Sequence, residues 1–296
     1  MFVMKIALLE AYPEIIPEYL DYLVEAWHTI FWYNHPYDPA IVDAIMVRSK
    51  IVVDVNLLTK YSALRYVLRV WVGLEKINTE LLGQQWIHLI NTPGSNSQAV
   101  AELVVRGMLS LLRNTQKKWH TLDDRFALLW AELHEKTIWI VGFGHIGRIV
   151  HRILSGFGVN NFLVYDPYVN ASLLHDTIIQ IVQTKEELFA QSDIITFHIP
   201  LSPETRNFLS QEDFALLKDA VKIINTSRWG IIDENALVAF LWTHKNAWAY
   251  IDTREWEPAD PKKGLLSLDN CIVTPHLWSM THEANRAMHR FNLPQA

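Results

Sequence analysis

Three glycines at the spacing G-x-G-x-x-G, namely Gly142, Gly144 and Gly147, have the clearest chemical purpose in this 296-residue chain. They follow an apolar run, 136–141, that predicts a strand, and they open a stretch, 146–155, whose apolar residues recur at helical spacing. In such a turn Gly142 permits the tight bend, Gly144 lets the backbone approach a pyrophosphate, and Gly147 lets the helix pack closely on the strand. The unpaired N–H groups at the start of the helix would bind the phosphates.

Asp166 completes this dinucleotide-binding pattern, because it lies nineteen residues after the last glycine and follows the next predicted strand, 162–165. Its carboxylate would accept hydrogen bonds from the adenosine ribose and would repel a 2′-phosphate, which favours NAD over NADP. The alternative is a purely structural glycine turn, with Asp166 as an ordinary loop acid. The candidate cofactor-binding residues of this segment are Gly142, Gly144, His145, Ile146, Gly147 and Asp166.

Short apolar runs alternate with longer amphipathic stretches along the chain, which is typical of a parallel sheet with helices on both faces. The second half contains six predicted strands, enough for a doubly wound dinucleotide-binding sheet: 136–141, 162–165, 194–198, 221–225, 247–252 and 271–274. We expect helix starts at Thr184, paired with Glu187 in a capping-box pattern, at Ser210, and at Asp233.

The first half predicts a smaller α/β domain of flavodoxin-like type, with strands at 5–9, 29–32, 44–47 and 66–70. The turn residues 91–95 mark the domain boundary, and a long helix, about 98–113, should follow. The fold class is therefore α/β with two Rossmann-like domains. We expect a substrate domain at 1–95, a dinucleotide-binding domain at 96–282, and the ligand in the cleft between them.

Composition excludes several other classes of protein. The formal net charge of −6 gives no reason to expect a nucleic acid or an anionic membrane as a partner. The single cysteine, Cys271, cannot form an internal disulfide, and its apolar surroundings favour a buried strand over a catalytic role. The apolar N-terminus reads as a strand rather than a signal peptide, no run is long enough to span a membrane, and the histidines show no metal-ligand spacing. We therefore expect a cytoplasmic protein with no metal.

Three further segments follow the ends of predicted strands, where an open parallel sheet presents its ligand crevice. They are Asn225-Thr226-Ser227-Arg228, Asp252 through Glu257-Pro258, and Thr274-Pro275-His276. With these segments, and with 91–96, 100–103 and 192–201, the chain resembles the D-isomer-specific 2-hydroxyacid dehydrogenases from about residue 48 to about residue 288.

The resemblance implies a catalytic triad of Arg228, Glu257 and His276, and reduction of a small 2-keto acid to a D-2-hydroxy acid with NADH. Protonated His276 would donate a proton to the keto oxygen as hydride arrives. Glu257 would orient the imidazole and raise its pKa, while Arg228 would hold the substrate carboxylate through its planar fork of donors.

The resemblance also implies which residues bind the cofactor and the substrate, and how the chain assembles. The resemblance places the segment His198–Pro200 beside the cofactor, and Thr226 and Asp252 near the nicotinamide. It places Arg48, Ser49, Gly73 and Asn96 on the substrate side. It also implies a homodimer, and it raises the possibility that residues 283–296 return to the first domain.

The chain departs from the family pattern mainly through bulky residues near the expected site. Trp71, Trp229 and Trp278 stand where smaller residues are usual. They leave the identity of the substrate open. Among small keto acids, we favour glyoxylate or hydroxypyruvate. Two other hypotheses remain: a non-catalytic NAD-binding regulator of corepressor type, and a hydride-transfer enzyme acting on another small anion such as formate or phosphite.

Overall fold

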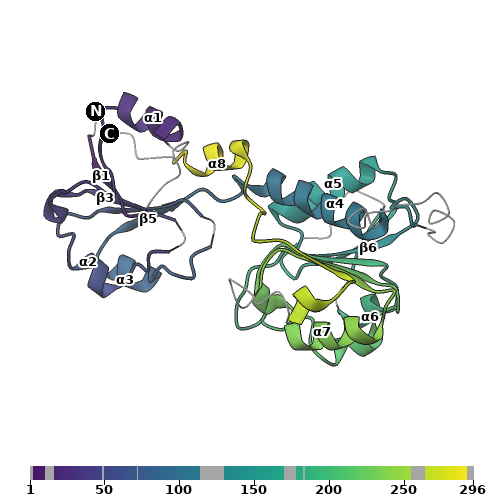
Figure 1. Ribbon diagram of the computed structural model, residues 1–296. Helices are drawn as coiled ribbons and strands as arrows, with labels where there is room; N and C mark the ends of the chain where they lie inside the picture. Colours follow the sequence, from purple (N-terminus) through teal and green to yellow (C-terminus); the bar gives the residue numbers. More distant parts are fainter. Residues whose placement is uncertain are drawn as a thin grey trace. The chain divides into compact units, whose positions relative to one another are not determined.

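The computed structural model describes residues 3–10, 17–48, 50–71, 73–113, 130–169, 178–182, 184–254 and 264–291. The chain divides into two compact units, one formed by Met1–Asn96 with Ser279–Ala296 and the other by Ser97–Trp278. Each contains its own parallel sheet (Figure 1).

The described part of the first unit is built on a five-stranded parallel sheet with the order β2-β1-β3-β4-β5. Its strands are β1 (Lys5–Leu8), β2 (Thr29–Phe31), β3 (Ala44–Val47), β4 (Tyr66–Arg69) and β5 (His88–Asn91). This is the flavodoxin-like strand order, so the predicted fold of this half is confirmed. The strand β5 was not predicted, because a run of four partly exposed residues that begins with a histidine gives little periodic signal.

Helices cover both faces of this sheet, with α1 (Pro17–Glu25) on one side and α2 (Val55–Leu58) and α3 (Thr79–Gln84) on the other (Figure 1). Side chains cap the short helices, since Asp54 accepts a hydrogen bond from the N–H of Leu57 and Asn78 accepts one from the N–H of Leu81, both at 3.0 Å. A 3-10 helix, η1 (Pro39–Ile41), precedes β3.

The C-terminal helix α8 (His282–Met288) belongs to the first unit although it is encoded last. The Tyr22 hydroxyl of α1 donates a hydrogen bond to the carbonyl of His289 at 2.8 Å, and the Thr92 hydroxyl donates one to the carbonyl of Met288 at 3.2 Å. These bonds tie the end of the described chain to α1 and to the residue after β5.

The second unit contains a seven-stranded parallel sheet in its described part, with the order β12-β11-β10-β9-β6-β7-β8. The strands are β6 (Thr137–Val141), β7 (Asn161–Tyr165), β8 (Ile179–Ile181), β9 (Ile194–Phe197), β10 (Lys222–Asn225), β11 (Trp248–Ile251) and β12 (Cys271–Val273). The order reverses at β6, which makes the sheet doubly wound as predicted. All six predicted strands are present, and the seventh, β8, escaped prediction because it is a three-residue edge strand.

Two hydrophobic cores fill the two sides of this sheet. The helices α4 (Ser97–Arg113) and α5 (His145–Gly156) cover one face, and α6 (Glu186–Phe189) and α7 (Glu234–Thr243) cover the other (Figure 1). The described part of this unit also contains three 3-10 helices: η4 (Asp213–Leu216), η5 (Trp229–Ile231) and η6 (Gly264–Ser267). Alternate residues of the strands point into opposite cores, as with Ile194 and Ile195 of β9.

Two of the predicted helix starts need correction. The capping box at Thr184 is absent, because α6 has Lys185 at its N-cap and no side-chain capping bond. Ser210 precedes a 3-10 helix whose N-cap is Glu212, and the Ser210 N–H and hydroxyl instead donate to the Asp213 carboxylate. The third expectation is confirmed, since Asp233 caps α7 by accepting a hydrogen bond from the N–H of Ala236.

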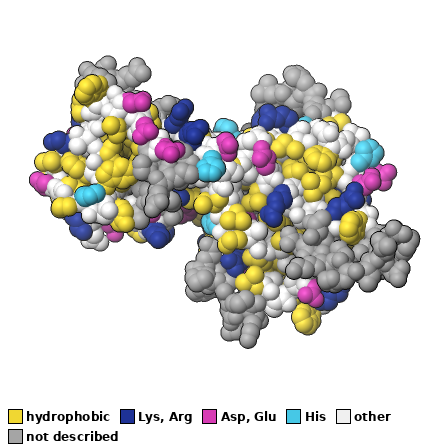
Figure 2. Space-filling model, turned by 45° about the horizontal axis from the view of Figure 1, so that its top comes forward, with side chains coloured by type: hydrophobic (Ala, Val, Ile, Leu, Met, Phe, Trp, Pro, Cys, Tyr) yellow, Lys and Arg dark blue, Asp and Glu magenta, His cyan; other side chains and the backbone are white. Residues whose placement is uncertain are grey.

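The mixture of acidic and basic residues in the composition is also seen on the surface. On the face drawn in Figure 2, acidic and basic side chains are interspersed among hydrophobic ones. Within the described ranges, no helix is both long and apolar enough to cross a membrane.

Candidate cofactor and catalytic site

The glycine loop between β6 and α5 has the geometry that its spacing predicts. Gly142 has a φ of +92°, and a Cβ there would lie 2.8 Å from the carbonyl oxygen of His198. A Cβ on Gly147 would overlap the carbonyl oxygen of Gly142, because the helix packs directly on the turn. A Cβ on Gly144, by contrast, would meet no atom within 4 Å. Packing therefore explains two of the glycines, and the third leaves a space that a bound group can use.

The helix α5 begins beside that space. Gly144 is its N-cap and supplies no side-chain acceptor, so the N–H groups of the first turn remain available to an anion. His145 is exposed in this turn and Ile146 is half-buried. An uncapped helix start next to an open glycine is an arrangement suited to a pyrophosphate.

Asp166 connects the end of β7 to the glycine loop. One carboxylate oxygen accepts a hydrogen bond from the N–H of Phe143 at 2.7 Å, and the other accepts one from the N–H of Tyr168 at 2.9 Å. A carboxylate can accept about four hydrogen bonds, so two positions remain for ribose hydroxyls. The structure thus adds a second role for Asp166, which is to hold the glycine loop in place.

Other predicted cofactor residues lie at the carboxyl ends of β9 and β10. Burial lowers the pKa of His198 to about 3, so its ring is neutral, and it shares a 3.1 Å hydrogen bond with the Thr196 hydroxyl. Pro200 is exposed two residues later. The Thr226 hydroxyl is buried and has no hydrogen-bond partner among the described residues. An unsatisfied buried hydroxyl and an open glycine at one sheet edge fit a bound dinucleotide.

Asp252 is fully buried at the end of β11, and its carboxylate holds the loop that carries His276. One oxygen accepts hydrogen bonds from the Thr274 hydroxyl and from the N–H of Leu277 at 2.8 Å, and the other accepts one from the N–H of Trp278 at 2.9 Å. The family resemblance placed Asp252 near the nicotinamide, but it did not predict these hydrogen bonds to the loop of His276.

His276 and Arg228 both lie near one buried indole, that of Trp278. The ring centroids of His276 and Trp278 are 5.6 Å apart, and the Arg228 guanidinium carbon lies 6.0 Å from the centroid of the Trp278 ring. Trp278 is only 6% exposed, so it forms part of the packed base of this region. Trp278, which stands where the family pattern has a smaller residue, is thus a neighbour of two predicted catalytic residues.

The side chain of Asn225 shapes the turn that presents Arg228. Its amide donates a hydrogen bond to the carbonyl of Arg228 at 2.9 Å, and its oxygen accepts bonds from the N–H and hydroxyl of Ser227 at 3.0 and 2.8 Å. The neighbouring Trp229 lies half-buried beneath the Arg206 guanidinium, 5.2 Å from ring centroid to guanidinium carbon. Glu257, the third predicted catalytic residue, lies outside the described residues.

The predicted substrate residues lie in the first unit. Arg48 follows β3, its backbone N–H donates to the buried carboxylate of Glu10 at 2.9 Å, and its guanidinium lies 5.8 Å from the Trp71 ring centroid. The Asn96 side chain is buried against the sulfur of Met288. Ser49 is outside the described residues.

Arg69, at the carboxyl end of β4, was not among the site residues predicted from the sequence. It ends β4 beside Val47 of β3, is only 4% exposed, and donates a hydrogen bond to the carbonyl of Gly73 at 3.0 Å. The sequence feature that could have identified Arg69 is its positive charge inside the otherwise apolar run 66–70. Arg69 therefore supports the turn that contains both Trp71 and Gly73.

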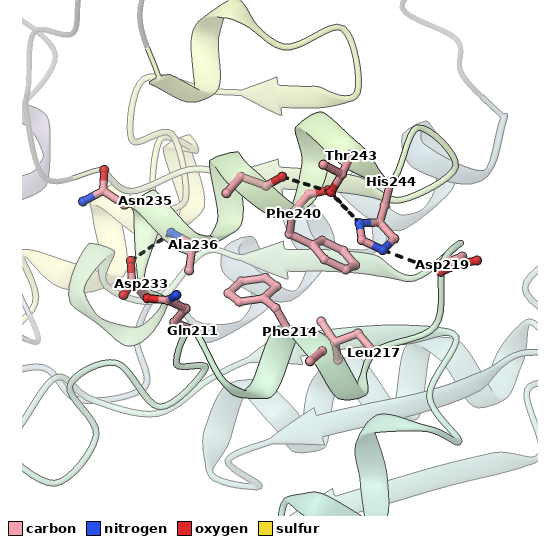
Figure 3. Close-up of a pocket in the computed structure, with 12 residues that line it drawn as sticks. Gln211, Phe214, Leu217, Asp219, Asp233, Asn235, Ala236, Phe240, Thr243 and His244 are labelled. Atoms are coloured by element: carbon pink, nitrogen blue, oxygen red, sulfur yellow. Dashed lines mark hydrogen bonds and ion pairs between the residues drawn. The ribbon is translucent and has the colours of Figure 1, made fainter.

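A cavity of about 670 Å³ lies elsewhere in the second unit, between η4 and α7. Figure 3 shows the rings of Phe214 and Phe240 facing each other there, and His244 directed towards Asp219 at 3.7 Å. None of the residues lining it is among the predicted cofactor or catalytic residues. In the part of the chain that the structure describes, no group of acidic, histidine and cysteine residues could hold a metal ion.

The doubly wound sheet, the glycine loop and the acid after β7 define a dinucleotide-binding protein of the Rossmann class. Comparison with known proteins agrees. Residues 102–277 match the family model described as D-isomer specific 2-hydroxyacid dehydrogenase, NAD binding domain. The chain belongs to this family, and the cofactor of its second unit is NAD.

Individual relatives are similar over most of this chain. A D-3-phosphoglycerate dehydrogenase of Methanocaldococcus jannaschii is 36% identical over 83% of this chain and 47% of its own length. A hydroxypyruvate reductase of Thermotoga maritima is 35% identical over 83% of this chain and 80% of its own. The structure of a D-2-hydroxyisocaproate dehydrogenase superposes with a TM-score of 0.82 at 25% identity, over 96% of this chain and 93% of that one. The chain spans about half the length of the phosphoglycerate dehydrogenase that it matches.

Proposed function

We propose that this protein is an NAD-dependent oxidoreductase that interconverts a small 2-keto acid and a D-2-hydroxy acid. The observation that carries the proposal is that His276 and Arg228 are both neighbours of Trp278, at the carboxyl edge of the sheet that holds the glycine loop. A proton donor and a carboxylate-binding cation at the edge where NAD binds are the two groups that reduction of a keto acid requires.

The side chains divide the chemistry as follows. Bound NADH supplies a hydride to the keto carbon. His276, protonated, donates its proton to the keto oxygen, and in the oxidative direction it accepts that proton from the hydroxyl. Arg228 holds the substrate carboxylate and polarises the carbonyl. Glu257 orients the His276 imidazole. The net reaction consumes one proton with each keto acid reduced.

Arg48, Ser49, Gly73 and Asn96 are proposed to bind the substrate, and we favour glyoxylate or hydroxypyruvate. Arg69 supports this assignment for Gly73, because its hydrogen bond to the Gly73 carbonyl holds the turn in one conformation. We also propose a cytoplasmic homodimer, which sedimentation equilibrium and subcellular fractionation would test.

The decisive experiment is NADH oxidation, followed at 340 nm, with a panel of 2-keto acids and with His276→Ala alongside the wild type. Turnover of a keto acid that falls by about 10²–10⁴-fold in the variant, with NADH binding retained, is the expected result. Tight NADH binding without turnover of any 2-keto acid would instead make the protein an NAD-binding regulator. Turnover of formate or phosphite alone would assign it to another hydride transfer.

A further inference from the structure

Glu10 is a buried acid at the carboxyl edge of the sheet in the first unit. β1 and β3 are parallel neighbours, with Leu8 opposite Met46, so both strands end at this edge. Glu10 lies two residues after β1, and Arg48 directly follows β3. Glu10 is only 8% exposed, and a carboxylate is rarely so buried unless other groups stabilise its charge.

Backbone N–H groups stabilise the Glu10 carboxylate. Its Oε1 atom accepts hydrogen bonds from the N–H of Arg48 at 2.9 Å and from those of Lys50 and Ile51 at 3.2 Å. Its Oε2 atom accepts one from the N–H of Lys50 at 3.1 Å. Hydrogen bonds to an ionised acceptor are stronger than those to a neutral one. A single side chain therefore holds the backbone of three residues.

These three residues lie outside any helix or strand, between the end of β3 and the bridge residue Val53. Backbone of this kind keeps one conformation only where other contacts hold it. The bonds to Glu10 supply such contacts at the point where the Arg48 side chain leaves the chain. The position of the Arg48 guanidinium, 5.8 Å from the Trp71 ring centroid, therefore depends on Glu10.

We propose that Glu10 is a positioning residue for substrate binding, because it fixes the backbone from which Arg48 extends. The inference rests on the proposed function, in which Arg48 binds the 2-keto acid. A guanidinium binds a carboxylate best through two parallel donors, so its affinity depends on where that fork is held. Glu10 acts only through the backbone, as Asp252 does for the loop of His276 in the other unit.

Glu10→Gln tests this role, because it keeps the shape of the side chain but replaces one acceptor oxygen with an N–H₂ group. We expect KM for the keto acid to rise about tenfold, with kcat and the dissociation constant of NADH within about twofold of the wild type. Displacing Arg48 weakens binding of the substrate and of the transition state alike, which changes KM rather than kcat.

Asp43→Asn is the matched control in the same unit. Asp43 directly precedes β3 and accepts a hydrogen bond from the backbone N–H of Lys5 at 2.9 Å, at the opposite end of the sheet. Its replacement also removes a carboxylate that holds backbone, and it should leave KM unchanged. An equal rise of KM in Asp43→Asn would mean that general loosening of the unit causes the effect, and would overturn the proposal.

A double-variant cycle decides whether Glu10 acts through Arg48. Arg48→Gln alone should raise KM by about tenfold or more. Glu10→Gln should then add less than about twofold, because there is no guanidinium left to displace. If the two effects on KM multiplied, Glu10 would serve the site by another route, and the positioning role would be wrong. Wild-type KM in Glu10→Gln would refute it equally.

Amide hydrogen exchange provides a readout that does not depend on turnover. In Glu10→Gln the three amides that Glu10 binds should exchange at least about tenfold faster than in the wild type. The amide of Leu57, which Asp54 binds at 3.0 Å in the same unit, should exchange at the wild-type rate. Unchanged exchange of the three amides would contradict the proposal. If the wild type reduces no keto acid, the proposed function fails, while exchange still decides whether Glu10 holds this backbone.

Glu10→Asp is the second variant, for use if Glu10→Gln does not fold. It keeps the charge but withdraws the carboxylate by one methylene, so it cannot reach all three N–H groups equally well. We expect the same changes in KM and in amide exchange, each about threefold. Wild-type values of both in Glu10→Asp, with no folded Glu10→Gln, would also count against the positioning role.

Discussion

The carboxylate of Asp252 is hydrogen-bonded to the backbone on the far side of His276, at 2.8 Å to the N–H of Leu277 and 2.9 Å to that of Trp278. His276 itself has a φ of +59°, a left-handed conformation that costs a residue with a Cβ of order 1 kcal/mol or more. The anchoring bonds to Asp252 offset that cost. A buried acid from one strand thereby determines the backbone conformation of the predicted proton donor on the next.

The first prediction follows from this anchoring. Asp252→Asn replaces one acceptor oxygen with an N–H₂ group that would face a backbone donor, so the loop should lose its anchor. We expect the free energy of unfolding to fall by about 2–4 kcal/mol and kcat to fall by about 10²-fold. Urea unfolding and NADH oxidation measure these effects. Asp219→Asn, at a carboxylate that is 87% exposed, is the matched control and should change neither.

A second prediction concerns the shape of the cation at position 228. Arg228→Lys keeps the charge but loses the planar pair of donors that binds a carboxylate in two places. We expect KM for the keto acid to rise by about 10–100-fold, with the dissociation constant of NADH unchanged. Steady-state kinetics and NADH fluorescence titration provide the two numbers. If the dissociation constant of NADH rose as much as KM, Arg228 would bind the cofactor instead of the substrate.

The glycine loop allows a paired prediction. Gly147→Ala should destabilise the fold or prevent folding, because its Cβ would overlap the Gly142 carbonyl. Gly144→Ala should leave the melting temperature unchanged, since its Cβ meets open space, yet it should weaken NADH binding by about tenfold or more by blocking backbone approach. Thermal unfolding and NADH titration separate the two effects. Unchanged NADH affinity in Gly144→Ala would show that the pyrophosphate binds elsewhere.

The fourth prediction is a pH dependence of stability in the first unit. His289 is fully buried, and burial lowers its pKa to about 4, aided by the positive charge of Arg48 and opposed by the hydrogen bond to the Asn285 carbonyl. Below its ordinary pKa of 6.5 the unfolded chain binds a proton that the folded chain does not. Stability from this group is therefore complete above that pH and falls by up to about 1.4 kcal/mol per pH unit as the pH drops towards the folded pKa.

Urea unfolding at pH 8 and pH 5 measures this slope. His289→Gln should flatten it, because glutamine does not titrate. His35→Gln, at an exposed position of the same unit, should leave the slope as it is in the wild type. If His289→Gln kept the wild-type dependence of stability on pH, other groups would be responsible for the loss of stability at acidic pH.

Much of the fold could be predicted because its signals are local. The apolar runs of β6, β9 and β10 are bounded by turn residues, and the glycine spacing identifies the strand-to-helix turn between β6 and α5 from adjacent residues alone. The elements that escaped prediction, β5 and β8, are short and partly exposed at sheet edges, where burial imposes little pattern on the sequence.

The amino-acid sequence by itself determined the two α/β folds, the dinucleotide loop, Asp166 and the family resemblance, because spacing along one strand and helix specifies them. Only the tertiary structure decided that Asp252 anchors the His276 loop, that Trp278 is a neighbour of both His276 and Arg228, and that the Tyr250 hydroxyl bonds to Arg106 of α4. These relationships link residues from different strands and helices. They depend on how the parallel strands stand side by side, which no local pattern of residues records.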